Sequence, residues 1–246
     1  MGTPPEHPIE SSQPGQTNVD PEVLRFVEET NAAGGTYHRL DFGGGLVVDG
    51  EYDLREYLSK YGLPDNLDGA SVLDVGTASG FFAIELAKRG GKVTAIDVND
   101  PSFAEMAFRA AGVSVVYHQM DLFDLDESFG SFDLVFCGSV LLHVWDQFNA
   151  IRRLRSVCGG RLIVATAVMP NDWRWRRIPA AKFVGARAEE NGREYWATWT
   201  PNRRGMLRML RVGGFPNAEF RSEFRLRSLP GKQNFDVLHG VFHASP

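Results

Sequence analysis

Between residues 71 and 167, continuous apolar runs alternate with amphipathic segments. The apolar runs are rich in Val, Ile and Leu and predict strands at 71–75, 92–96, 113–117, 132–137 and 161–167. The amphipathic segments predict helices at 80–89, 102–111 and 146–157. This alternation predicts an α/β fold whose parallel sheet is covered by helices on both faces.

The carboxy-terminal part has a different pattern. A helix is expected at 202–210, with Asn202 at its N-cap. Two further strands are expected at 218–226 and 235–243, on either side of Pro230 and Gly231. Two strands joined by a short loop predict an antiparallel hairpin at one edge of the sheet.

Three regions make up the expected domain organisation. Residues 1–18 are rich in Pro, Gly, Ser, Gln and Thr and are expected to be a disordered tail. Residues 19–69 are expected to be an N-terminal helical cover, with helices at 21–31 and 53–61 around an extended stretch and a triple-glycine turn. Residues 70–246 then form the main domain, with an insert at 170–201.

Composition excludes several classes of protein. The 246 residues and 43% hydrophobic content suit one α/β domain with additions, and the net charge of -5 argues against a basic nucleic-acid coat. The two cysteines provide neither a disulfide framework nor zinc spacing, so a cytoplasmic protein with no metal site is expected. The chain has no apolar run long enough to span a bilayer, and residues 1–18, which lack an apolar core, are not expected to be a signal peptide.

The segment VLDVGTASG, at residues 72–80, combines the end of a strand, a loop of small residues and the start of a helix. Backbone N–H groups at such a helix start favour an anionic or polar ligand group. A dinucleotide site would have a glycine where Thr77 stands, and a phosphate loop would have Gly-Lys-Ser/Thr after Gly80, so both are disfavoured. A structural β-turn-α unit without a ligand remains an alternative.

The segment resembles the first motif, hhDhGxxxG, of class I S-adenosylmethionine (SAM) methyltransferases, and further motifs follow in the family's order as far as Ala167. The resemblance implies a Rossmann-like seven-stranded sheet of order 3-2-1-4-5-7-6, with one antiparallel edge strand. It implies SAM as the cofactor. The implied cofactor-binding residues are Asp74, Gly76, Thr77, Ala78, Ser79, Gly80, Asp97, Val98, Asp121, Leu122, Cys137 and Gly138.

Two acidic residues are central to this interpretation. Asp97 ends the second strand about 20 residues after Gly76, the spacing at which a carboxylate accepts hydrogen bonds from a ribose diol. Its alternative role is a helix N-cap. In the family, an acidic residue in the place of Asp121 binds the adenine amino group, and the next backbone N–H, here that of Leu122, donates to a ring nitrogen. The alternative for Asp121 and Leu122 is a solvated loop.

A closer likeness is to the sub-family that includes the bacterial tRNA wobble-uridine carboxymethyltransferase. It rests on DVGTASGF together with the upstream pair Tyr37 and His38. This likeness implies carboxy-SAM as an alternative donor and tRNA as an alternative partner. The present chain is shorter and net acidic, whereas a tRNA-binding protein usually has a basic face.

The insert at 170–201 is rich in Trp and Arg and is expected to be an acceptor lid. Aromatic side chains form rigid apolar walls, and Arg binds carboxylate or phosphate through two hydrogen bonds. The candidate substrate-binding residues are Trp173, Trp175, Arg176, Tyr195, Trp196 and Trp199. A structural cap and an RNA-stacking surface are the alternatives.

Methyl transfer from a sulfonium mainly requires alignment of nucleophile, methyl carbon and sulfur, helped by a general base where the acceptor is a hydroxyl or amine. The candidate catalytic residues are His143, in the loop after the fourth strand, with Tyr37 and His38 on the N-terminal cover. The function expected is SAM-dependent methyl transfer to an oxygen or nitrogen of a small-molecule acceptor. The alternatives are tRNA wobble-uridine modification with carboxy-SAM, a nicotinamide oxidoreductase and a non-catalytic SAM-binding protein.

Overall fold

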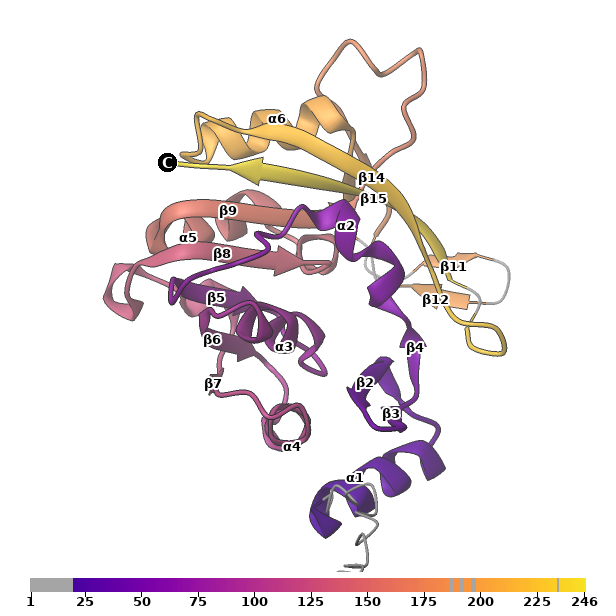
Figure 1. The fold of residues 1–246 in the computed structure, drawn as a ribbon. Coiled ribbons are helices and arrows are strands. Elements are labelled where there is room, and N and C mark those ends of the chain that lie inside the picture. Colours follow the sequence, from indigo (N-terminus) through magenta and orange to yellow (C-terminus); the bar gives the residue numbers. More distant parts are fainter. Residues whose placement is uncertain (1–19, 186–187, 191–192, 196–197, 234) are drawn as a thin grey trace, which may run out of the picture.

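A seven-stranded sheet forms the centre of the protein in a computed structural model that describes residues 20–185, 188–190, 193–195, 198–233 and 235–246 (Figure 1). Its strands are β5 (Ser71–Val75), β6 (Lys92–Asp97), β7 (Val115–Gln119), β8 (Phe132–Gly138), β9 (Cys158–Ala167), β14 (Glu219–Arg227) and β15 (Asp236–Ala244). The spatial order is β7-β6-β5-β8-β9-β15-β14, which confirms the expected order 3-2-1-4-5-7-6. The tail at residues 1–18 lies outside the described residues.

The direction of the strands refines the expected edge. β5 to β9 pair in parallel, and β15 runs antiparallel to both of its neighbours, β9 and β14. The reversed strand is therefore β15, one place in from the edge, and not the edge strand itself. The reason is that β15 returns from the hairpin between β9 and β14, so the first strand of the hairpin is left at the edge.

Four helices cover the two faces of the sheet. They are α3 (Phe81–Lys88), α4 (Ser102–Ala110), α5 (Gln147–Val157) and α6 (Arg203–Val212). Side chains alternate along each strand, so Val72 and Phe136 pack in the core with α3 and α4, whereas Leu73 and Val135 pack in the core with α5 and α6. This produces the three-layer arrangement that the continuous apolar strands indicated.

The N-terminal segment is more mixed than the helical cover expected from the sequence. It contains α1 (Pro21–Ala32), β1 (Thr36–His38), β2 (Leu40–Gly43), β3 (Leu46–Val48), β4 (Gly50–Tyr52), a 3-10 turn (Leu54–Tyr57) and α2 (Leu58–Tyr61). Gly43, Gly44 and Gly45 all have positive φ, which lets β2 turn back and pair with β3. The segment runs along one end of the sheet, from α1 against α4 to α2 against β14 (Figure 1).

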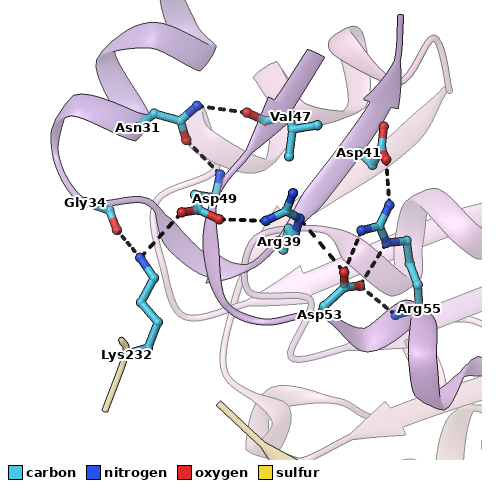
Figure 2. Close-up of polar contacts among 9 residues, drawn as sticks. All are labelled: Asn31, Gly34, Arg39, Asp41, Val47, Asp49, Asp53, Arg55 and Lys232. Atoms are coloured by element: carbon cyan, nitrogen blue, oxygen red, sulfur yellow. Dashed lines mark hydrogen bonds and ion pairs between the residues drawn. The ribbon is translucent and has the colours of Figure 1, made fainter. Parts of the chain in front are cut away.

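A polar network fixes this cover to the β14–β15 hairpin (Figure 2). Lys232, in the hairpin loop, donates to the carbonyl oxygen of Gly34 at 2.9 Å, and its Nζ lies 3.9 Å from Asp49. Within the cover, Asp53 accepts two side-chain hydrogen bonds from Arg55. These contacts join residues 198 positions apart in the sequence, and through them the hairpin helps to hold the cover at the end of the sheet.

The insert after β9 consists of two short hairpins. β10 (Ala181–Phe183) pairs with β13 (Trp199–Pro201), and β11 (Ala188–Glu190) pairs with β12 (Arg193–Tyr195). Asn202 joins the insert to α6: its Oδ1 accepts from Gly205 N at 2.7 Å, and its Nδ2 donates to the carbonyl oxygens of Trp175 and Ile178. The expected N-cap role of Asn202 is thus confirmed. Among the described residues, each helix is too short or too polar to cross a membrane.

Candidate active site

The loop between β5 and α3 takes its shape from residues with positive φ. Gly76 has φ 74°, Ala78 has φ 48° and Gly80 has φ 90°. A Cβ on Gly76 would lie 2.2 Å from Cγ2 of Val140, and a Cβ on Gly80 would lie 2.7 Å from the ring of Phe108. Both glycines are therefore required by backbone angle and by space, since real Cβ atoms do not approach other atoms so closely.

Asp97 braces this loop from the end of β6. Its Oδ2 accepts from Ala78 N at 2.8 Å, and its Oδ1 accepts from Asn99 N at 3.0 Å. The helix that follows begins only at Ser102, whose N–H is bonded by Asp100. Asp97 is consequently not the N-cap of that helix, which removes the alternative role considered from the sequence.

A cavity of about 460 Å³ opens where β5, β6 and β8 end, and its volume falls within the range of about 300–1,000 Å³ common for small-ligand sites. Of the predicted residues, those that line it are Tyr37, His38, Gly76, Ala78, Asp97, Val98, Asp121, Leu122, Gly138 and His143. These side chains come from the cover and from the loops after four different strands. The structure therefore brings together residues that are up to 106 positions apart (143 − 37) in the sequence.

A second depression of about 850 Å³ lies at the opposite ends of the strands, near Ala70, Asp133 and Gly160. Although it is larger, ligands of open parallel sheets bind beyond the carboxyl ends of the strands. Asp133 itself accepts hydrogen bonds from Ser71 N and Ser71 Oγ, at 2.8 and 2.7 Å, and so connects β8 to β5. We therefore place the site in the smaller cavity.

Five of the predicted cofactor residues lie behind the cavity wall. They are Asp74, Thr77, Ser79, Gly80 and Cys137, all of which are buried. Ser79 has a definite supporting contact, because its Oγ accepts from His38 N at 3.0 Å. This bond attaches the cover directly to the glycine loop.

Burial strongly changes two ionisable groups here. The pKa of Asp74 is raised from 3.8 to about 7, mainly by burial and further by the charge of Asp97. Burial lowers the pKa of His38 to about 3, so its imidazole is neutral at physiological pH. Nδ1 of His38 is buried without a hydrogen-bond partner among the described residues, and His38 lines the cavity. A ligand atom is the natural partner for such a group.

The insert residues whose side chains the structure describes do not line this cavity. Trp173 is 75% exposed, and Trp175, Arg176 and Trp199 are not among the residues lining the cavity. Trp196 lies outside the described residues, and for Tyr195 only the backbone in β12 is described. The predicted acceptor role of the insert stays a prediction.

Ser139 and His239 are functional candidates that the sequence did not reveal. Ser139 follows β8, lines the cavity and has φ 58°, while His239 lies fully buried on β15. They are 100 residues apart, yet Ser139 Oγ and His239 Nε2 are separated by 3.1 Å. A serine in a loop and a histidine in an apolar strand give no sequence signal of this pairing.

This chain resembles known proteins in sequence and in fold. A family profile described as a methyltransferase domain matches residues 72–159. A ubiquinone biosynthesis O-methyltransferase of Sodalis glossinidius is 30% identical over 195 residues, covering 73% of this chain and 74% of that protein. The enzyme of the same name from Pseudomonas syringae is 37% identical over 106 residues, which cover 41% of this chain and 46% of that protein.

Solved structures agree on the fold. The N-terminal domain of EvdMO1, with S-adenosylhomocysteine (SAH) and D-fucose present, has a TM-score of 0.64 at 15% identity over 94% of this chain and 99% of that chain. Magnesium protoporphyrin IX methyltransferase from Synechocystis, with bound SAM, has a TM-score of 0.53 at 17% identity over 95% and 87% of the two chains. At these identities the likeness concerns the fold alone.

Fold, cavity and sequence relatives together define a Rossmann-like group-transfer enzyme. The chain belongs to the class I SAM-dependent methyltransferases, and it transfers a methyl group from SAM to a small-molecule acceptor. The site fits this cofactor: the cavity is lined by the carboxylate of Asp97, by Gly76 with its positive φ, and by His38, whose Nδ1 has no partner among the described residues. Within the described part of the chain, no group of three or more His, Cys, Asp or Glu is placed to hold a metal ion.

Proposed function

We propose that the acceptor atom is a hydroxyl oxygen of a small aromatic molecule. The observation that carries this proposal is the match to an O-methyltransferase of ubiquinone biosynthesis over 73% of the chain. The lining of the cavity supports it, since Val140 and Val144, on either side of His143 in the sequence, add apolar surface to the cavity. Such walls suit an aromatic ring better than a highly charged acceptor.

The donor would lie across the carboxyl ends of β5 and β6. Asp97 would accept from the ribose hydroxyls, and Asp121 with the backbone of Leu122 would meet the adenine edge. Val98 is 60% exposed and lines the cavity, so its apolar side chain is available to pack on the adenine ring. Gly76 and Ala78 would face the methionine part of the donor.

When bound, SAM supplies an electrophilic methyl group on a sulfonium. Transfer would form an oxygen–carbon bond to the acceptor and break the sulfur–carbon bond with its electron pair going to sulfur, and the acceptor would lose one proton. We assign that proton to His143, which is exposed and lines the cavity. His38 is a poor general base because its pKa of about 3 leaves little affinity for a proton at neutral pH. Tyr37 and His38 would instead close over the donor from the cover.

Turnover with labelled SAM and a panel of catechols, phenols and aromatic amines tests this proposal. We expect methyl ethers from at least one catechol or phenol and little product from the amines. Labelled amine products without labelled ethers would contradict transfer to oxygen. His143→Gln should lower kcat by about 100-fold at neutral pH while SAM affinity stays within about twofold.

Two further proposals concern the donor and the location of the protein. Transfer of a carboxymethyl group from carboxy-SAM to tRNA remains the alternative, and the mass of the donor that copurifies with the protein distinguishes the two donors. A cytoplasmic location is supported by Cys137 and Cys158, which are both free and buried.

A further inference from the structure

Ser139 is held in an unusual backbone conformation at the mouth of the cavity. Three described non-glycine residues have positive φ, and two of them, Ala78 and Ser139, line this cavity. A left-handed conformation is strained for a non-glycine residue, and such residues cluster at functional sites. The conformation of Ser139 is fixed by its N–H, which donates to the carbonyl oxygen of Ala165 at 2.7 Å.

The side chain of Ser139 is fixed by His239. Nδ1 of His239 lies 3.1 Å from the carbonyl oxygen of Val237, which can only accept, so Nδ1 carries the proton. Nε2 is then an acceptor, and the hydroxyl of Ser139 donates to it across 3.1 Å. The ring of His239 is itself held by stacking on Phe224, with 5.6 Å between centroids.

His239 remains neutral, so this arrangement persists at physiological pH. Burial lowers its pKa to about 4, and the nearby His143 shifts it in the same direction. A base of this strength does not take the acceptor's proton at neutral pH. The pair is therefore suited to orienting an acceptor and not to deprotonating it.

Once its proton is directed at His239, the oxygen of Ser139 has only lone pairs left for a ligand. We propose that Ser139 Oγ is the hydrogen-bond acceptor for a hydroxyl group of the methyl acceptor, with His239 as the residue that positions it. The subsite would thus select molecules that present an O–H at this point over their methyl ethers, including the methylated product. This inference rests on the proposed transfer to a hydroxyl oxygen.

Equilibrium binding tests the subsite without turnover. The probes are catechol and its dimethyl ether, veratrole, each titrated into protein saturated with SAH. Wild type should bind catechol about 5- to 10-fold more tightly than veratrole, as expected for one hydrogen bond. Ser139→Ala and Ser139→Gly should both lose this preference. Because glycine adopts a positive φ without strain and alanine does not, the same loss in both variants would show that the missing hydroxyl, and not backbone strain, is the cause.

Variants of His239 test the direction of the bond. In His239→Phe the hydroxyl of Ser139 is free to donate to an ether oxygen, so the preference for catechol should shrink or reverse. His239→Gln offers a side-chain oxygen that can accept from Ser139, and should restore the preference. Equal binding of the two probes by wild type, or an unchanged preference in Ser139→Ala, would overturn the proposal. Failure of turnover with intact discrimination would count against the proposed O-methylation alone.

Discussion

Gly76 is required for the shape of the glycine loop between β5 and α3. It combines φ 74° with a contact in which any Cβ would meet Val140 at 2.2 Å. We expect Gly76→Ala to lower the free energy of unfolding by about 2–5 kcal/mol, the sum of backbone strain and steric overlap, and to abolish SAM binding. Urea denaturation and calorimetric titration with SAM measure the two effects.

Gly112→Ala is the matched control for this substitution. Gly112 has φ 65°, and a Cβ there would meet nothing within 4 Å. The control should lower the free energy of unfolding by only about 1 kcal/mol and leave SAM binding intact. Equal losses of binding in the two variants would show that overlap with Val140 is not the cause.

Asp74 gives the site a pH dependence with a definite sign. Its pKa is raised from 3.8 to about 7, so between these values the folded state holds a proton that the unfolded state has released. The stability contributed by Asp74 is complete below pH about 4 and is lost as pH rises through about 7. Asp74→Asn should therefore become more stable relative to wild type across this window, by at most about 4 kcal/mol.

Urea denaturation at pH 4.5, 6 and 8 checks this expectation, with Asp133→Asn as control. Asp133 is exposed and its pKa is lowered by hydrogen bonds from Ser71, so its contribution is already present above pH about 4. The difference between Asp133→Asn and wild type should hardly change from pH 6 to 8. A constant difference for Asp74→Asn over all three pH values would show that Asp74 does not titrate in this window.

At the scale of elements, Asn202 connects the insert to α6 through both ends of its amide. Asn202→Asp keeps the oxygen that caps α6 but replaces the Nδ2 donor to Trp175 and Ile178 with a second oxygen. We expect this variant to unfold at nearly the wild-type temperature while trypsin cleaves the insert at Arg174, Arg176 or Arg177 several times faster.

Asn202→Ala removes both functions and should in addition lower the free energy of unfolding by about 1–2 kcal/mol. Thermal melting of the two variants measures the contribution of the N-cap to stability, and limited proteolysis measures how firmly Asn202 holds the insert. Identical cleavage rates in wild type and Asn202→Asp would show that the insert is held by other contacts.

At the scale of the whole molecule, the β14–β15 hairpin holds a cover that supplies two residues of the site. Lys232 contacts Gly34 and Asp49 of the cover (Figure 2). The same cover contributes Tyr37 and His38 to the lining of the cavity. Lys232→Met should change the free energy of unfolding by less than about 1 kcal/mol, because the contact is on the surface. Hydrogen exchange of residues 20–52 should nevertheless become faster and SAM affinity should fall several-fold. Lys60→Met, at an exposed lysine of α2, is the control, and equal exchange in both variants would contradict the coupling.

The sequence predicted those parts of the protein that depend on local patterns. Apolar runs located the strands of the sheet, and the loop at Gly76 with Asp97 located the cavity in which we place the donor, because strand, turn and helix signals all act over a few residues. The extended stretch expected before the triple-glycine turn corresponds to β1 and β2, but the sequence did not predict β3 and β4, nor the pairing of Ser139 with His239. Three-residue strands are too short for a periodic pattern, and a contact between residues 100 positions apart depends on the order of β8, β9 and β15.

The central claim is that Asp97 and the glycine loop form a SAM site, and calorimetric titration of SAM into the protein tests it most directly. The test variant is Asp97→Ala, which removes the carboxylate at the cavity. The control is Asp100→Ala, which removes an exposed carboxylate three residues further along the chain that accepts from Ser102 N. We expect wild type and Asp100→Ala to bind SAM alike, and Asp97→Ala to bind it on the order of 100-fold more weakly. Absence of SAM binding by wild type, or unchanged affinity in Asp97→Ala, would contradict this account.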